Sequence, residues 1–223
     1  MKRAILAMAM ATGVAAANVD DFTETFETNA GWIDGGFTPL TEVASGSSDG
    51  TSYVTTNRSF LNTDPGSFDV LFRGEPSVLP GIIPDASGGA FQGDYISSGI
   101  TQLSFDVRHN GVAPVNFFVR IAPPTRFPGA IAVEFVPVFG GSWTTVTIDI
   151  SSSSFNFVSF EGFTYDDIFD DVGLIQIGID STNLAGIPGD FTFDLDNVSI
   201  TPTPGVTGVL AIGGLVAARR RRG

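Results

Sequence analysis

The sequence predicts an all-β fold, an antiparallel β-sandwich, and three observations support this prediction. Short runs along most of the chain alternate between apolar and polar residues, as strands with one buried face do. Turn-forming Gly, Pro, Ser and Asp residues separate these runs, and no stretch between the two chain ends repeats apolar residues at helical spacing. The 20 phenylalanines supply side chains large enough to fill a core between two sheets.

Six runs show the strand pattern most clearly. Within residues 143–150, Val146, Ile148 and Ile150 share one face with Thr144, and Trp143 lies on the other face with Thr145, Thr147 and Asp149. In the run Phe191–Ile200 we expect the alternation of apolar and polar residues to break once. After this break Val198 and Ile200 point inward, as Phe191, Phe193 and Leu195 do before it. Ser45–Gly50 and Ser151–Ser154 are expected to be loops. The six expected strands are Ile100–His109, Val115–Ile121, Ala130–Val136, Trp143–Ile150, Val172–Asp180 and Phe191–Ile200.

The N-terminal residues have the composition of a secretory signal peptide. Lys2 and Arg3 form a basic start, Ala4–Val14 is apolar, and Ala15–Ala17 offers a small-residue cleavage site. We therefore expect residues 1–17 to be a signal peptide and the protein to be exported.

The pattern of the C-terminal residues 201–223 is typical of a membrane-directed sorting tail. Pro202 and Pro204 precede 13 uncharged residues, 206–218, and the basic residues that follow are Arg219, Arg220, Arg221 and Arg222. Thirteen residues form a helix of roughly 20 Å, whereas the hydrocarbon core of a bilayer is about 30 Å thick. A span this short suits recognition and removal by a membrane enzyme better than permanent anchoring.

This tail resembles the PEP-CTERM sorting signal of exported bacterial proteins. The two prolines, the apolar segment and the terminal arginines match the signal, whereas Thr203 stands where the family has glutamate. The resemblance implies delivery to the cell envelope, the cell surface or the medium, and processing by an exosortase-like membrane enzyme. Whether the tail is cleaved or retained stays open.

Composition limits what the domain at residues 18–200 binds. Without the two ends, 5 arginines and 24 acidic residues remain, so the net charge is 5 − 24 = −19. A surface this acidic repels nucleic acid, so a nucleic-acid partner is not expected. The chain has no cysteine, and therefore neither a disulfide nor a thiolate metal site. Calcium, which prefers carboxylate and carbonyl oxygens, is the expected cofactor if there is one.

Three segments of the domain resemble the jelly-roll domains of carbohydrate-binding modules. They are Phe26–Glu27 with the following Ala30–Trp32, the run beginning at Gly141–Trp143, and Phe193–Ile200. The resemblance implies a jelly-roll-like sandwich in which the first and last strands pair. It also implies a structural calcium between Glu27 and Asp196.

A second acidic cluster is a further candidate calcium site. Asp166, Asp167, Asp170 and Asp171 lie close enough in the sequence to repel one another, and a cation would relieve this repulsion. The alternative interpretation is a solvated acidic loop.

Aromatic side chains are the candidate sugar-binding residues, because an exposed ring stacks on the apolar face of a pyranose. Trp32 lies between Gly31 and the pair Gly35–Gly36, which favours an exposed loop, and Tyr95 is a second candidate. Trp143 begins a strand and is expected in the core. The alternative is that both tryptophans are buried.

The sequence gives no positive evidence for catalysis. His109 is the only histidine and precedes the turn-forming pair Asn110–Gly111, so we expect it at the surface rather than in a catalytic triad. Two function classes remain. One is a non-catalytic envelope or matrix protein whose sandwich serves structure or adhesion. The other is a lectin-like module that binds an extracellular polysaccharide. A glycoside hydrolase is a distant third.

Overall fold

The computed structural model describes residues 19–76 and 85–202. The expected signal peptide, residues 1–17, lies outside the described residues. So does the expected sorting tail beyond Pro202, including Pro204 and the terminal arginines. In the described part, no helix is long and apolar enough to cross a membrane.

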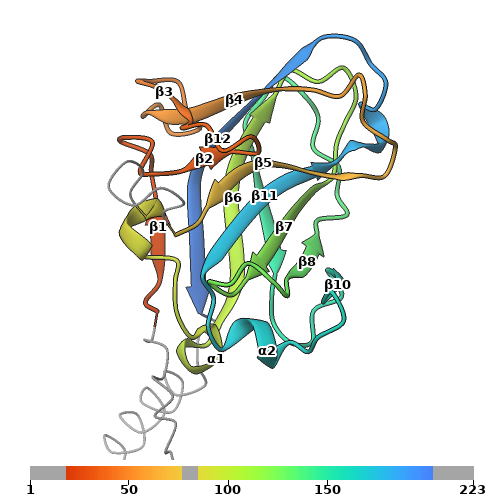
Figure 1. Ribbon diagram of the computed structural model, residues 1–223. Coiled ribbons are helices and arrows are strands. Elements are labelled where there is room, and N and C mark those ends of the chain that lie inside the picture. Colours follow the sequence, from red (N-terminus) through yellow and green to blue (C-terminus); the bar gives the residue numbers. More distant parts are fainter. Residues whose placement is uncertain (1–18, 77–84, 203–223) are drawn as a thin grey trace, which may run out of the picture.

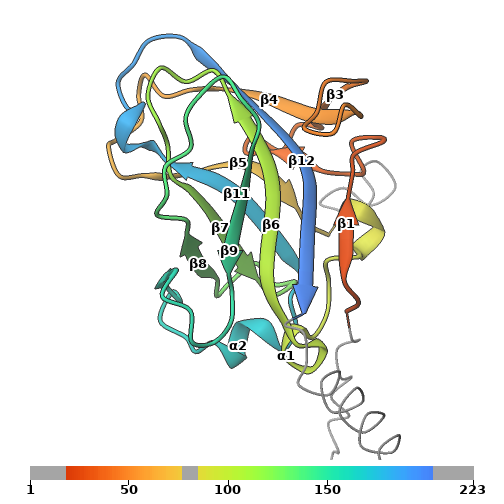
Figure 2. The ribbon, with the colours of Figure 1, turned by 180° about the vertical axis from the view of Figure 1, so that it is seen from behind.

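Two antiparallel sheets pack face to face, with the core between them. The strands of the first sheet are β1 (Phe22–Glu24), β3 (Thr41–Val43), β4 (Tyr53–Ser59), β6 (Ile100–His109), β9 (Thr144–Asp149) and β12 (Asp190–Pro202). Those of the second sheet are β2 (Ile33–Asp34), β5 (Phe68–Gly74), β7 (Phe117–Ala122), β8 (Ala130–Val133), β10 (Phe157–Ser159) and β11 (Leu174–Asp180). The β11 strand crosses in front of β6 in Figure 1 and behind it in Figure 2.

The strand orders are β3-β4-β12-β6-β9 in the first sheet, with β1 also paired to β12, and β10-β8-β7-β11-β5-β2 in the second. The short helices α1 (Tyr95–Ser98) and α2 (Asp166–Phe169) lie together at one end of the sandwich (Figure 1). Two 3₁₀ segments complete the structure, η1 (Ala86–Gly89) and η2 (Ser181–Asn183).

The long strand β12 confirms two expectations. Its register against β6 shifts between Asp196 and Ser199, where Asn197 has a positive φ of 51°. This bulge is the expected break in alternation, and Val198 and Ile200 are buried as a result. The first and last strands also pair, because β1 is antiparallel to the end of β12.

Phenylalanine rings fill the space between the sheets, as the composition predicts. The fully buried rings of the core cluster are those of Phe26, Phe60, Phe72, Phe105, Phe117, Phe169 and Phe193. Each such burial stabilises the fold by about 1.5–3 kcal/mol. With no disulfide in the chain, this apolar core is the main source of stability.

Candidate functional site

A row of long polar side chains crosses the outer face of the second sheet, which points away from the core. Gln176 of β11 is paired with Arg73 of β5 on one side and with Arg120 of β7 on the other. Their strand neighbours Ile175 and Ile177 belong to the core, so the three polar side chains share the opposite face. We call the surface formed by Arg73, Gln176, Arg120 and the nearby Arg126 the arginine face.

A tight turn after β2 places an aromatic ring over this row. The Asp34 carboxylate accepts hydrogen bonds from the backbone N–H groups of Gly36 and Thr38, both at 2.8 Å. The turn holds Phe37 at a positive φ of 65°, and its side chain is 47% exposed. The guanidinium carbon of Arg73 lies 4.5 Å from the centre of the Phe37 ring, a cation–π contact.

The far end of the row is fixed by an ion pair. Arg120 donates Nε–H and Nη2–H bonds to the two carboxylate oxygens of Glu161, at 2.7 and 2.9 Å. A second Nη2–H bond reaches the Arg126 carbonyl oxygen at 2.9 Å, and the Gly129 N–H also donates to Glu161. Bonding to Arg120 lowers the pKa of Glu161, so this carboxylate stays ionised and positions the loop that carries Arg126.

The Nε–H of Arg73 and the carboxylate of Glu75, which lies beside the arginine face, are buried without a hydrogen-bond partner in the described part. Both carboxylate oxygens of Glu75 lack a hydrogen-bond partner in the described part, and the nearest cation is Arg126, at 3.6 Å. Burial raises the pKa of Glu75. Burial also lowers the pKa of Arg73, which the charges of Arg126 and Arg120 lower further, although Glu75 opposes this shift.

The loops around the face combine exposed rings with strained backbone. The rings of Phe127 and Phe163 are 58% and 46% exposed and contact each other edge to face, with centroids 5.5 Å apart. Phe37, Arg126 and Glu161 all have positive φ although none is glycine. Such conformations cost of order 1–3 kcal/mol each and gather where a surface is shaped for binding. The face therefore offers apolar rings beside guanidinium and amide donors, an arrangement suited to binding rather than to acid–base catalysis.

The outer face of the first sheet carries an acidic cluster under the loop of residues 45–52. Asp196 is paired across the strands with Asp106, which accepts hydrogen bonds from Ser48 Oγ, Thr145 Oγ1 and Asn197 Nδ2. Asp196 is fully buried, and its Oδ1 has no hydrogen-bond partner in the described part. Burial raises the pKa of Asp196 to about 6, and the charges of Asp49 and Asp106 add to the rise.

This cluster fits calcium only in part. The Asp196 Oδ1 atom is the kind of uncompensated oxygen that a cation would bind. Glu27 is exposed and lines a hollow with Glu24, and no hydrogen bond or charge interaction among the described residues connects Glu27 with Asp196. Nor do the described ranges contain three or more acidic or histidine side chains placed to share one metal ion. A calcium ion at Asp196 would therefore need hydroxyl, amide or carbonyl oxygens as well.

The second predicted calcium cluster lies at α2. Asp166, Asp167, Asp170 and Asp171 are all exposed to solvent. Asp167 accepts hydrogen bonds from the N–H and hydroxyl of Thr164, at 2.9 and 2.6 Å, and so shapes the start of the helix. Partial burial raises the pKa of Asp170, and the charges of Asp171 and Asp94 raise it further. The geometry matches a solvated acidic segment.

The structure reverses the expected placement of the tryptophans. Trp32 is 0% exposed, packs edge to face on Phe26 and Phe91, and donates its indole N–H to Ser87 Oγ at 2.9 Å. It therefore offers no ring face to a sugar. The glycines beside Trp32 do not mark an exposed loop: Gly31 has a positive φ of 77°, and Gly35 packs closely against the Val70 carbonyl of β5.

Trp143, which was expected in the core, is partly exposed on the outer face of the first sheet. There it contacts Tyr53 and covers the Arg108 guanidinium at 4.8 Å.

Tyr95 and His109 also lie elsewhere than the sequence predicts. Tyr95 is fully buried, its hydroxyl donates to the Phe91 carbonyl oxygen at 2.9 Å, and burial raises its pKa, so it is a core residue rather than a ligand platform. His109 is also buried rather than at the surface. Its Nδ1 accepts from the Gly111 N–H and its Nε2–H donates to the Val138 carbonyl, because the turn folds the ring inward. Burial lowers its pKa, and both nitrogens are already engaged.

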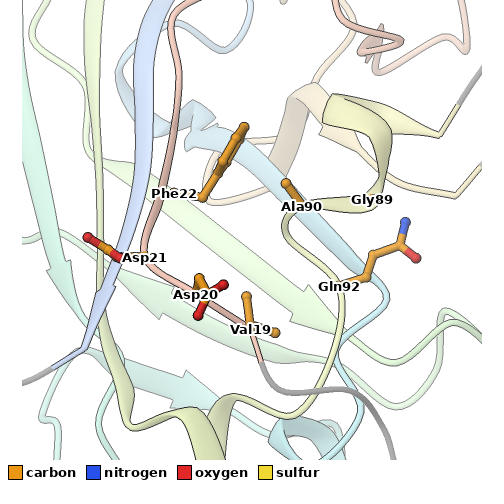
Figure 3. A pocket seen from close by; sticks show the side chains of 7 residues that line it. All are labelled: Val19, Asp20, Asp21, Phe22, Gly89, Ala90 and Gln92. Carbon is orange, nitrogen blue, oxygen red and sulfur yellow. The ribbon is translucent and has the colours of Figure 1, made fainter.

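A hollow near the start of β1 does not form a convincing second site. Figure 3 shows its lining, in which the side chains of Asp21 and Gln92 point away from each other. Its polar groups do not converge on one position, as they do in a small-molecule site. The lining residues are Val19, Asp20, Asp21, Phe22, Gly89, Ala90 and Gln92.

No protein-family model and no curated protein sequence matches the chain. Among solved structures, it is 15% identical to the family 11 carbohydrate-binding module of a cellulosomal cellulase of Clostridium thermocellum, over 84% of this chain and 97% of that one, with a TM-score of 0.50. The fold is a jelly-roll β-sandwich.

Two other structures are similar at lower TM-scores. The CBM22-1 xylan-binding domain from Paenibacillus barcinonensis is 14% identical over 83% of this chain and 96% of that one, with a TM-score of 0.45. The CBM22-1–GH10 modules of a Clostridium thermocellum xylanase, complexed with xylohexaose, are 20% identical over 82% of this chain, with a TM-score of 0.48. The chain spans 28% of that xylanase chain.

Proposed function

We propose that the β-sandwich is a non-catalytic carbohydrate-binding domain and that a polysaccharide lies on the arginine face. The observation that carries this proposal is the exposed Phe37 ring held beside the Arg73–Gln176–Arg120 row. Sugars present apolar C–H groups on their ring faces and hydroxyls at their edges, so aromatic rings beside hydrogen-bond donors suit them. The similarly folded family 11 module is a carbohydrate-binding module, which supports the proposal.

We propose that the Gln176 side chain, which is 6% exposed, adds specificity to this surface. Its amide lies between the two arginines and makes no hydrogen bond within the described part of the chain. An amide both donates and accepts, so it complements hydroxyl groups, which do the same. This pattern favours glycan binding over a purely structural or adhesive role for the sandwich.

Affinity electrophoresis of the full-length chain in gels containing xylan, β-glucan, agarose or polygalacturonate tests the proposal. We expect retardation by at least one polymer, and a loss of affinity in Phe37→Ala of about tenfold, equivalent to about 1.4 kcal/mol. Phe139→Ala, which removes a 67% exposed ring from another loop, is the matched control and should bind as the wild type does. Binding that survives Phe37→Ala but is lost in Trp143→Ala would move the site to the first sheet.

We also propose the route by which this domain reaches polysaccharide. Residues 1–17 direct export, and the tail containing Pro202, Pro204 and the terminal arginines is recognised by an exosortase-like membrane enzyme. The composition of both ends supports this route. Cell fractionation tests it with a chain truncated after Thr203. If the truncated chain is found in the same fraction as the intact one, the tail has no sorting role.

A structural calcium ion at Asp196 is a further proposal, supported by the uncompensated Oδ1 atom. Saturating calcium should raise the melting temperature of the full-length chain by several degrees relative to chelator, because a ligand that binds only the folded state adds stability on the kcal/mol scale. A shift below about 1 °C contradicts a structural calcium.

A further inference from the structure

We infer that the polysaccharide bound at the arginine face is anionic and that its carboxylate groups pair with Arg73 and Arg126. This inference rests on the proposed carbohydrate-binding function and specifies the class of polymer.

Three of the five arginines in the domain already have a carboxylate partner within the fold. Arg58 donates to Asp69 at 2.7 Å, and Arg108 donates to Asp194 at 2.8 Å. Arg120 forms a two-point pair with Glu161 at 2.7 and 2.9 Å. In a domain with 24 acidic residues and 5 arginines, internal pairing is what the composition favours.

The remaining two, Arg73 and Arg126, make no hydrogen bond to a carboxylate, and both lie on the arginine face. Arg126 approaches Glu75 only at 3.6 Å, beyond hydrogen-bond distance, and its side chain is 43% exposed. The Nε–H of Arg73 is buried without an acceptor in residues 19–76 and 85–202. All 24 acidic residues of the chain fall within those ranges, and the segment 77–84 contains none. The chain therefore supplies neither guanidinium with a hydrogen-bonded side-chain carboxylate.

The nearby carboxylates attract these two guanidinium groups through their charge but make no hydrogen bond to them. Asp34 is engaged by backbone N–H groups of its own turn, and Glu161 is engaged by Arg120. Glu75 is buried and hydrogen-bonds neither arginine. A guanidinium presents its N–H donors in a planar fork that matches the two oxygens of a carboxylate, and such bonds are about twice as strong as neutral ones.

The acidity of the rest of the domain does not prevent this pairing. A net charge of −19 slows the approach of an anionic polymer at low salt. At physiological ionic strength the Debye length is about 8 Å, so exposed acids beyond that distance are largely screened. The affinity for an anionic polymer then depends mainly on the carboxylate–guanidinium contacts within hydrogen-bond distance.

Two polymers with the same backbone test the charge requirement. Polygalacturonate carries a carboxylate on each sugar, and fully methyl-esterified polygalacturonate carries an uncharged ester at the same position. We expect the full-length chain to bind polygalacturonate at least about tenfold more tightly than the ester, measured by isothermal titration calorimetry. Alginate, another uronate polymer, and carrageenan, a sulfate ester, show whether a carboxylate specifically is needed.

Variants locate the charge requirement on the face. Arg73→Gln and Arg126→Gln, each verified as folded by circular dichroism, should lower affinity for polygalacturonate about tenfold and lower affinity for the ester much less, so that the preference for the charged polymer shrinks. Arg58→Gln, at an arginine already paired on β4, is the matched control and should change neither. Equal binding of the two polymers, lost in Phe37→Ala, would overturn the anionic inference and leave the carbohydrate-binding function standing. Absence of binding to every polysaccharide would overturn both.

Discussion

Replacing Asp196 by asparagine should make the protein more stable at neutral pH in the absence of calcium. The side chain is fully buried, its Oδ1 has no hydrogen-bond partner among the described residues, and its pKa is raised from 3.8 to about 6. At pH 7 the folded state must therefore hold a buried charge that the unfolded state exposes to water. One pKa unit is equivalent to 1.36 kcal/mol, so this cost is at most about 3 kcal/mol.

The sign of the pH dependence follows from the raised pKa. Below pH 3.8 both states carry the proton, and the stabilising contribution of Asp196 is fully present. As the pH rises through 6 the folded state loses this proton and the contribution disappears. Asp196→Asn keeps an uncharged side chain at all pH values, so its advantage over the wild type should be largest at pH 7 and should fall to about 0.5 kcal/mol at pH 4.

Urea unfolding in chelator, at pH 7 and pH 4, measures both quantities. Asp190→Asn, the same substitution at an exposed position of the same strand, should change stability by less than about 0.5 kcal/mol. A destabilised Asp196→Asn at pH 7, or an equal gain at both pH values, would refute the argument from burial.

Two further predictions concern the core and the tryptophans. Gly74→Ala should destabilise the fold by about 1–3 kcal/mol in urea, because an added Cβ lies 2.6 Å from the Trp32 ring; an unchanged midpoint would mean that the ring moves freely. Trp143→Phe, which leaves only Trp32, should give blue-shifted fluorescence that acrylamide quenches weakly. Trp32→Phe, which leaves only Trp143, should give red-shifted fluorescence that acrylamide quenches strongly. Similar quenching of the two variants would contradict the burial of Trp32 and the partial exposure of Trp143.

The alternation of apolar and polar residues predicted the strands in which every second side chain is buried. It missed the strands in which burial does not follow this period of two. The β6 strand has the predicted bounds, Ile100–His109. In β5 a register shift leaves Leu71 and Phe72 adjacent and both buried, which breaks the period of two. In β4 only Tyr53 and Val54 are buried, so the sequence of the rest of the strand has the polar pattern that is typical of a loop.

The sequence could not predict the arginine face because its parts come from distant segments. Phe37, Arg73, Arg120, Arg126 and Gln176 belong to a turn, three strands and a loop, and only the register of the second sheet brings them together. One indication was present in the composition. Arginine is scarce in the domain, and two of its five arginines, Arg73 and Arg120, interrupt apolar strand runs. A charged side chain is unusual at such a position and therefore points to a function.

The tryptophan assignments failed for a related reason. The alternating pattern of residues 143–150 places Trp143 with the polar residues rather than with Val146, so its position in a strand is not a reason to expect it in the core. The placement of Trp32 depends on Ser87 and Phe91, more than 50 residues further along the chain. Long-range packing of this kind leaves no local trace.

The position of β12 determines how the domain responds to mechanical force. This strand is hydrogen-bonded to β6 on one side, from Phe193 to Pro202, and to β4 and β1 on the other. If a polymer is held at the opposite sheet, as proposed, a pull along β12 from its C-terminal end loads those hydrogen bonds in shear, so they share the load and resist it together. A pull between the two ends of the chain instead peels β1 from β12 one bond at a time, beginning where Phe22 meets Ile200. We therefore expect the sandwich to resist tension along β12 from its C-terminal end better than a pull that separates β1 from β12.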